Sequence, residues 1–297
     1  MSTFATPPHT MSTRLLVMEG NTAEARARQV QFGGEAASEG YARLLRELFP
    51  DAVVDICYPA DPGANLPHAG EMEGYDGIAI TGSSLNIYNG GPEIQQQIDM
   101  LRASFTTGTP IFGSCWGLQL IAVAAGGTVR RNPRGREVGF ARRVRLTTDG
   151  RDHGLFQGKP LVFEAMTVHL DEVESLPDGT RLLATNDHSQ VQAVEIPCGT
   201  STAWAVQYHP EYPFREMAAI FRRLGPSLMV EGFFNDEEAQ NNFVGDLEAL
   251  ERDPTNHALM WRHGIDAAVV SKDMRTLEIR NWVQNQVIPM RAQRGRG

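Results

Sequence analysis

The chain has 297 residues, 41% of them hydrophobic, and carries a formal net charge of −9 with a pI near 5.4. That length suits one domain of roughly 200 residues with an appendage better than two equal domains. The acidic balance argues against a nucleic-acid surface, and no apolar run has membrane-spanning length. Residues 1–13 lack the basic start and apolar stretch of a signal peptide, and the three cysteines lack zinc-like spacing, so we expect a cytoplasmic protein without a metal or cofactor.

The first part of the chain predicts alternating strands and helices. Residues 1–13 are rich in Ser, Thr and Pro, which predicts a disordered head. Short apolar runs predict strands at Arg14–Met18, Ala52–Cys57, Ile78–Thr81 and Pro110–Phe112. Helices are expected around Tyr41–Leu48 and from Pro92 to Phe105, and residues 59–72 are expected to be a loop. Such alternation predicts a parallel sheet covered on both faces, with functional loops at the carboxyl ends of its strands.

In the rest of the chain, the pattern of apolar residues changes twice. Between Val129 and Trp204, short alternating runs predict antiparallel strands added to the sheet before residues 204–207 rejoin it. Four arginines at positions 130, 131, 134 and 136 form a basic cluster, which fits either a solvated loop or a docking site for an anion or partner. The last stretch, residues 226–297, carries apolar residues at helical spacing, so we expect it to pack on the core or to form a homodimer surface.

The most informative motif is Gly113-Ser114-Cys115-Trp116-Gly117, which directly follows a short apolar run. A cysteine between two glycines at a strand-to-helix turn is the pattern of a nucleophile elbow, where small neighbours leave the sulfur accessible. The helix expected over residues 117–125 would point its first N–H groups at Cys115 and stabilise negative charge there. Taken alone, the motif also fits an ordinary buried cysteine.

A histidine far along the chain is a candidate partner for this cysteine. The segment Gln207-Tyr208-His209-Pro210-Glu211 closes the apolar run 202–206. A cysteine nucleophile needs an imidazole to take its proton, and the imidazole needs an acceptor on its other nitrogen. His209 and Glu211 are the candidates for these two roles. The alternative interpretation of this segment is a surface His-Pro turn.

Two further segments complete a family likeness. Residues 77–84 read Gly-Ile-Ala-Ile-Thr-Gly-Ser-Ser, and residues 169–173 read His-Leu-Asp-Glu-Val. With the cysteine and histidine motifs in the same order, over about residues 14–211, the chain resembles the class I glutamine amidotransferases. The likeness is closest to stand-alone members similar to the glutaminase half of GMP synthase and to the γ-glutamyl peptidases.

The resemblance implies an α/β fold of the flavodoxin-like type over residues 14–225, with a mostly parallel sheet flanked by helices and a C-terminal helical extension over residues 226–297. It also implies a Cys115–His209–Glu211 triad that cleaves γ-glutamyl amides through a γ-glutamyl thioester. The oxyanion hole would consist of the backbone N–H groups of Ser83 and Trp116.

The resemblance also implies a binding site for the glutamyl group. The residues expected to form it are Gly82, Gln119, Val168, His169 and Leu170. Gln119 also fits a helix residue that packs on its neighbours. We expect His169 to fix a loop rather than to act as a second base, because the sequence assigns it no carboxylate partner.

The chain departs from the family pattern at two positions. Many members carry Gly-Gly-Pro where this chain reads Gly82-Ser83-Ser84, which puts the shape of the pocket rim in doubt. Trp116 stands where a smaller aliphatic residue is common. Its ring is expected either to line the entrance and stack on a bulky leaving group or to pack against the sheet edge.

Three functions therefore stay open from the sequence. The first is a free-standing hydrolase of γ-glutamyl amines, amides or short peptides, with a small-molecule substrate. The second is a glutaminase subunit that passes ammonia to a separate synthase partner. The third is a non-catalytic binding protein on the same fold. The filled triad argues against the third, and the His-Leu-Asp-Glu-Val segment with Trp116 favours the first.

Overall fold

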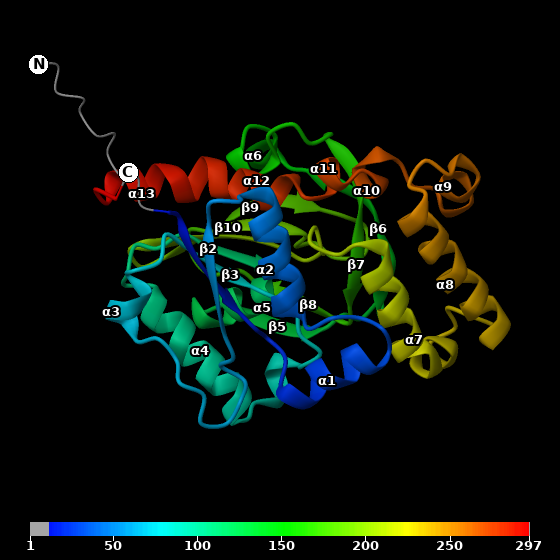
Figure 1. The fold of residues 1–297 in the computed structure, drawn as a ribbon, viewed down its shortest axis with the longest axis horizontal. Coiled ribbons are helices and arrows are strands. Elements are labelled where there is room, and N and C mark those ends of the chain that lie inside the picture. The colour runs from blue at the N-terminus through cyan, green and yellow to red at the C-terminus, as the bar shows by residue number, and fades with distance from the viewer. Residues whose placement is uncertain (1–11, 297) are drawn as a thin grey trace, which may run out of the picture.

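The computed structural model describes residues 12–296, and a sheet with helices on both faces lies at its centre (Figure 1). This sheet has nine strands. The strand order is β2-β1-β3-β4-β11-β10-β9-β6-β7. The parallel strands are β1 (Arg14–Met18), β2 (Val53–Cys57), β3 (Gly77–Ile80), β4 (Ile111–Ser114) and β11 (Ser201–Val206). The antiparallel strands are β6 (Glu137–Leu146), β7 (Val162–His169), β9 (Arg181–Thr185) and β10 (Ala193–Cys198). The expected mostly parallel sheet with added antiparallel strands is confirmed.

A separate antiparallel pair and several helices complete the fold. The pair consists of β5 (Thr128–Arg131) and β8 (Asp171–Ser175). The helices before β11 are α1 (Ala23–Gln31), α2 (Ala37–Leu48), α3 (Ala69–Met72), η1 (Ile87–Asn89), α4 (Pro92–Ser104), α5 (Trp116–Ala124), α6 (Thr148–Arg151) and η2 (Gly154–Phe156). The helices after it are α7 (Phe214–Val230), α8 (Glu237–Arg252), α9 (His257–His263), α10 (Ala267–Val270), α11 (Lys272–Arg275), α12 (Leu277–Trp282), the π-helical turn η3 (Val283–Val287) and α13 (Ile288–Gln293).

Alternating residues of the central strands build two separate cores. Leu15 and Val17 of β1 face one side of the sheet and pack with α2 and the C-terminal helices. Leu16 and Met18 face the other side and pack with α4 and α5. Because successive side chains of a strand point to opposite faces, an unbroken apolar strand requires a cover on both faces. The sandwich of helices around the sheet follows directly from that constraint.

The structure corrects two of the expectations for individual segments and adds one helix. The stretch expected to be a loop ends in the short helix α3, and α1 was not predicted at all. The basic cluster is not a solvated loop throughout, because Arg130 and Arg131 end strand β5. The side chain of Arg130 forms ion pairs with Glu172 and Glu174 of the neighbouring strand β8.

The C-terminal helices contribute directly to the main core. The ring of Trp282 is fully buried and lies 5.7 Å from the ring of Phe112 in β4. A Cβ atom at Gly77 of β3 would lie 2.9 Å from Trp282, so glycine is required where the ring crosses that strand. The predicted boundary between residues 225 and 226 falls inside α7, and the division of the chain into these domains stays a prediction.

A buried ion pair ties α12 to the segment that follows β11. Glu278 is fully buried, and its carboxylate accepts hydrogen bonds from the Tyr208 hydroxyl at 2.7 Å and from Lys159 Nζ at 3.0 Å. Lys159 also donates to the carbonyl of Met274. Tyr208 immediately precedes His209, so the C-terminal extension fixes the chain next to that histidine.

We expect Glu278→Ala to lower the free energy of unfolding by about 3–5 kcal/mol, because it leaves the Lys159 ammonium and the Tyr208 hydroxyl buried without their acceptor. Urea denaturation measures this loss. The control is Asp273→Ala, which removes an exposed ion pair with Arg280 in the same segment and should change stability by less than about 1 kcal/mol. Equal losses for both variants would show that the buried pair contributes no more to the free energy of unfolding than the exposed pair.

Candidate active site

Cys115 occupies a strained turn between β4 and α5. Its backbone has φ 53° and ψ −100°, and the residue is one of two non-glycine residues with positive φ in the described chain. Such a conformation costs free energy and persists only where the surrounding structure enforces it. The backbone N–H of Cys115 donates to the carbonyl of Val206 at 2.8 Å, which ties the turn to the end of the neighbouring strand β11.

The two glycines of the motif are required by packing. A Cβ atom at Gly113 would lie 2.6 Å from the backbone carbon of Gly117. A Cβ atom at Gly117 would lie 2.7 Å from the carbonyl oxygen of Ile80 in β3. Helix α5 therefore approaches the ends of two strands more closely than any residue with a side chain allows. This close approach accounts for the spacing of the motif.

His209 and Glu211 follow the next strand of the sheet and lie in one hydrogen-bonded pair. The Nδ1 atom of His209 is 2.7 Å from Oε1 of Glu211, and the backbone N–H of His209 donates to the carbonyl of Met166. Glu211 lies in a turn after β11 rather than on the strand itself. The Nε2 atom of His209 is buried and forms no hydrogen bond of normal geometry within residues 12–296.

The charges around His209 favour its protonated form. Burial lowers the pKa of His209, but the negative charges of Glu211 and Cys115 outweigh burial and raise the pKa to about 10. These contacts therefore favour the protonated imidazole. This arrangement supplies both a counter-charge for a thiolate and a proton donor for a leaving amine.

Tyr212 was missed by the sequence interpretation. Its ring stacks on the imidazole of His209, with centroids 4.0 Å apart and planes 6° from parallel. The stacked ring and the Glu211 contact together restrict rotation of the imidazole. A tyrosine three residues after a histidine carries no periodic signal, so only the tertiary structure reveals this contact.

The loop after β3 lies against the same histidine. A Cβ atom at Gly82 would lie 2.7 Å from Cε1 of His209, so glycine is needed here for close approach. The Asn21 side chain donates to the Gly82 carbonyl and accepts from the backbone N–H of Ser84. Ser83 stands between these two anchored residues, and its hydroxyl accepts from the backbone N–H of Leu85.

The buried carboxylate of Glu19 holds this loop in place through hydrogen bonds. Glu19, at the carboxyl end of β1, is fully buried and accepts hydrogen bonds from the backbone N–H groups of Asn21 and Ser38. It also accepts from the hydroxyl of Thr81. The sequence offered one signal for it, namely a charged residue at the end of an apolar strand, where functional loops of such sheets gather.

The ring of Trp116 does not line the site, so the expectation that it stacks on a leaving group is wrong. The residue is 1% exposed, and its indole N–H donates to Oε1 of Gln97 in α4 at 2.9 Å. The ring packs with the core between α4 and α5, which agrees with the alternative interpretation. Its backbone N–H, in contrast, lies in the first turn of α5, where helix N–H groups lack intrahelical acceptors.

Gln119 and His169 line the same cavity as Cys115 and Tyr212. The Gln119 amide donates to the carbonyl of Asp171 and to the side chain of Gln207. The Cys115 sulfur is 3.6 Å from the carbonyl oxygen of Val168. Gln119, Val168 and residues 169–171 all line the cavity that contains Cys115.

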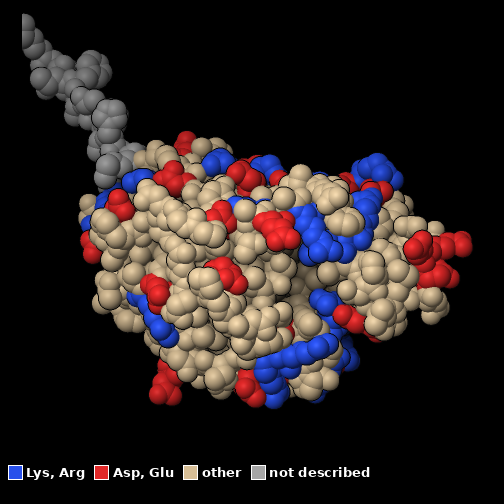
Figure 2. All heavy atoms as spheres, turned by 90° about the horizontal axis from the view of Figure 1, so that it is seen from below, with Lys and Arg blue, Asp and Glu red and all other residues tan. Residues whose placement is uncertain are grey.

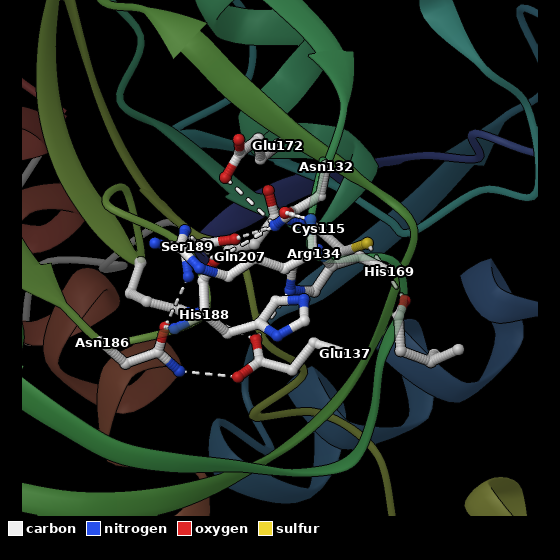
Figure 3. A network of polar contacts seen from close by, with 12 residues as sticks. Cys115, Asn132, Arg134, Glu137, His169, Glu172, Asn186, His188, Ser189 and Gln207 are labelled. Carbon is white, nitrogen blue, oxygen red and sulfur yellow. Dashed lines mark hydrogen bonds and ion pairs between the residues drawn. The ribbon is translucent and has the colours of Figure 1, made fainter. Parts of the chain in front are cut away.

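The carboxylate partner of His169 is Glu137, which the sequence did not assign. Figure 3 shows His169 beside Glu137, and the Nε2 atom of His169 lies 2.8 Å from that carboxylate. The Nδ1 atom of His169 lies 2.8 Å from the Asp171 carbonyl oxygen. Asn186 and Gln192 donate to the same carboxylate. Burial raises the pKa of Glu137, but these hydrogen bonds and the charge of His169 lower it on balance. Both ring nitrogens of His169 are thus occupied, which agrees with a loop-fixing role.

The cavity is hollowed between the strand ends and the helices α1 and α7. Its volume is about 290 Å³, and it is lined by both His209 and Cys115. The view from below shows Lys and Arg side chains bordering a hollow on this face (Figure 2). Within residues 12–296, no cluster of three or more His, Cys, Asp or Glu side chains has the arrangement of a metal site. No helix in the same range is long and apolar enough to cross a membrane.

Comparison with known proteins identifies the family. A model described as glutamine amidotransferase class-I matches residues 43–224. A γ-glutamyl-L-1-hydroxyisopropylamide hydrolase from a Pseudomonas species is 37% identical over 93% of this chain and 94% of that protein. The chain belongs to the class I glutamine amidotransferase family. Its membership makes it an amide-hydrolysing enzyme and confirms the resemblance drawn from its motifs.

Other relatives and solved structures agree with this family. One subunit of a glutamine-hydrolysing GMP synthase from Methanocaldococcus jannaschii is 35% identical over 44% of this chain and 65% of that protein. A glutamine amidotransferase from Thermotoga maritima has a TM-score of 0.60 at 17% identity, covering 93% of this chain and 98% of that one. A GMP synthase subunit from Thermoplasma acidophilum has a TM-score of 0.52 at 24% identity, covering 72% of this chain and 93% of that one. These likenesses support the predicted fold class.

We expect Gly117→Ala to destabilise the protein by roughly 1–3 kcal/mol and to reduce activity, because the new methyl group collides with the Ile80 carbonyl under the elbow. Thermal unfolding and turnover measure the two effects. The control is Gly245→Ala in α8, where no atom lies within 4 Å of the added carbon. That variant should be stabilised by about 0.5–1 kcal/mol. An active, equally stable Gly117→Ala protein would contradict the packing explanation.

Proposed function

We propose that the protein is a free-standing hydrolase of γ-glutamyl amides that uses Cys115 as its nucleophile. The observation that carries the proposal is the joint geometry of the strained cysteine and the His209–Glu211 pair at one cavity. The Cys115 thiolate attacks the γ-carbonyl, and His209 gives its proton to the leaving nitrogen. Water deprotonated by His209 then hydrolyses the γ-glutamyl thioester and releases glutamate. Glu211 orients the imidazole throughout.

The oxyanion formed in both steps needs hydrogen-bond donors. We assign this role to the backbone N–H groups of Ser83 and Trp116. The position of Trp116 in the first turn of α5 and the anchoring of the Ser83 loop by Asn21 support the assignment. Donors fixed before the reaction stabilise developing charge without further reorganisation.

The glutamyl group is assigned to the side of the cavity formed by residues 168–170, with Gly82 and Gln119. Two observations support this assignment. These residues all line the cavity, and hydrogen bonds hold this wall in place. Asp171, which also lines the cavity, accepts hydrogen bonds from Asn86 and Tyr88 and so joins this wall to the loop after β3. A rigid wall favours one orientation of the substrate, in which the γ-carbonyl carbon lies next to the Cys115 sulfur.

A glutaminase subunit that supplies ammonia to a separate synthase is the second candidate. The relation to a separate subunit of GMP synthase favours it. The free-standing hydrolase is preferred because the relative named as a γ-glutamyl-L-1-hydroxyisopropylamide hydrolase aligns along nearly the whole chain, including the C-terminal extension.

Cys115→Ala is expected to lower kcat by at least about 10⁴-fold without unfolding the protein, because the nucleophile is lost while the small elbow residue is kept. His209→Ala should cost nearly as much, and Glu211→Ala should cost less. The matched control is Cys198→Ala, which removes a buried thiol whose pKa burial raises to about 12. Retained turnover in Cys115→Ala would refute the nucleophile assignment.

The choice between the two candidate functions is tested with the purified protein alone. We expect kcat/KM for N-substituted γ-glutamyl amides, beginning with γ-glutamyl-L-1-hydroxyisopropylamide, to exceed kcat/KM for glutamine. The physical reason is that the cavity lined by Cys115 and His209 also extends to residues of α1 and α7, which leaves room for a substituent. A preference for glutamine that rises when a synthase from the same organism is added would support the glutaminase function instead.

A further inference from the structure

Helix α1 forms part of the wall of the cavity that contains Cys115. Ala25, Arg26 and Gln29 of this helix line the cavity, and α7 contributes further lining residues. Figure 1 shows α1 at the lower edge of the molecule, next to α7. Displacement of α1 would therefore remove one wall of the catalytic cavity.

This helix contributes nothing to the hydrophobic cores. None of its nine residues is buried. The hydrophobic clusters of the described chain contain no residue between Gly20 and Ala36. The next helix, α2, differs, because it buries Ser38, Tyr41, Ala42, Leu44 and Leu45. Local opening costs little free energy where few apolar contacts are lost, so we expect α1 to open more readily than α2.

Polar contacts hold α1 at its two ends. In the first turn, the backbone N–H of Ala23 donates to Oδ1 of Asp61 at 3.0 Å, and Arg26 forms an ion pair with the same carboxylate at 2.6 Å. In the last turns, the contact with α7 depends on one side chain. Among residues 12–296, Gln29 is the one residue of α1 that forms hydrogen bonds with α7.

The amide of Gln29 bridges two charged residues of α7. Its Nε2 atom donates to Oε1 of Glu216 at 2.6 Å, and its Oε1 atom accepts from Nε of Arg223 at 2.6 Å. Both partners line the cavity. An amide side chain can donate and accept at once, and hydrogen bonds to charged groups are stronger than those between neutral groups. The closed position of α1 therefore depends strongly on this residue.

The chain that follows α1 packs against the same hydrogen bond. A Cβ atom at Gly34 would lie 2.5 Å from Nε2 of Gln29 and 2.9 Å from Oε1 of Glu216. The backbone N–H of Glu35 donates to the other oxygen of Glu216 at 3.1 Å. One buried carboxylate of α7 thus holds both the helix and the segment after it.

We propose that α1 is a lid over the catalytic cavity and that Gln29 is the positioning residue that holds it closed. The lid opens when Gln29 releases Glu216 and Arg223, while α2 and the sheet keep their packing. It closes over a glutamyl group held at Cys115. The opening is independent of the proposed reaction, whereas closure over an occupied site rests on the assignment of Cys115 as the nucleophile.

Amide hydrogen exchange measures the opening without a ligand. The amides of residues 26–31 should exchange at least about 100-fold faster than those of α5, which is buried along almost its whole length. Gln29→Ala removes both contacts with α7, so it should raise the exchange rates of α1 by about 10-fold or more and leave those of α2 unchanged.

The matched control is Gln31→Ala. This glutamine lies on the same helix, is exposed, does not line the cavity and forms no side-chain hydrogen bond within residues 12–296. Both substitutions change the intrinsic helix propensity equally, so Gln31→Ala should alter the exchange of α1 by less than about 2-fold. Gly34→Ala keeps Gln29 but pushes a methyl group into its hydrogen bond, and it should speed exchange as Gln29→Ala does. Thermal unfolding of each variant separates local opening from loss of fold.

Steady-state kinetics connect the lid to the site. The substrate is whichever of glutamine and γ-glutamyl-L-1-hydroxyisopropylamide the enzyme turns over faster. Gln29→Ala should raise KM by about 3-fold or more with a smaller change in kcat, because the open protein must close before it holds the substrate. Gln31→Ala should leave both constants unchanged. An unchanged KM in Gln29→Ala would contradict the lid.

Labelling of Cys115 with a diazoketone analogue of glutamine should slow the exchange of α1 by about 10-fold, because the occupied site favours the closed state. Exchange of α1 as slow as that of α5, equal exchange in Gln29→Ala and Gln31→Ala, or no slowing in the labelled protein overturns the lid and leaves the hydrolase function intact. Absence of the label from Cys115 overturns the nucleophile assignment, and the comparison of Gln29→Ala with Gln31→Ala then decides the lid alone.

Discussion

The close approach of α5 to the ends of β3 and β4 is the constraint on which the site depends. Only glycine fits at positions 113 and 117, and this approach leaves Cys115 in a backbone conformation that side-chain-bearing residues rarely adopt. The hydrogen bond from Cys115 to Val206 then fixes the turn against β11. Since His209 follows that strand, the sheet pairing itself brings Cys115 and His209 to one cavity. The free energy that maintains the strained turn comes from the two packed cores on either side of the sheet.

The segments around Cys115, His209 and Glu211 are each held by buried polar contacts from distant parts of the chain. Glu278 accepts a hydrogen bond from Tyr208 beside the histidine, and Glu137 bonds to His169 at the cavity. Glu19 holds the loop after β3. A buried carboxylate is costly unless it is hydrogen-bonded, so each of these groups also disfavours alternative loop positions. The C-terminal extension thereby becomes part of the support of the site, although it lies beyond the region matched by the family model.

Residue patterns predicted the parts of this molecule that local chemistry determines. The apolar runs located the central strands, and the glycine spacing located the elbow, because both depend on neighbours in sequence. The stacking of Tyr212 and the carboxylate partner of His169 escaped prediction, since each joins residues without a shared periodicity. Trp116 shows the limit most clearly: its position in α5 was predictable, but the direction of its ring depends on Gln97, a partner on another helix.

Covalent labelling of the nucleophile tests the central claim most directly. A diazoketone analogue of glutamine places an electrophilic carbon where the γ-carbonyl of the substrate would lie. We predict loss of activity together with one label per chain, located on Cys115 by peptide mass spectrometry and slowed by a γ-glutamyl amide substrate. The other two cysteines, Cys57 and Cys198, are buried, and burial raises the pKa of each thiol to about 12. Inactivation with the label on another residue, or full activity in a protein labelled at Cys115, would contradict the mechanism.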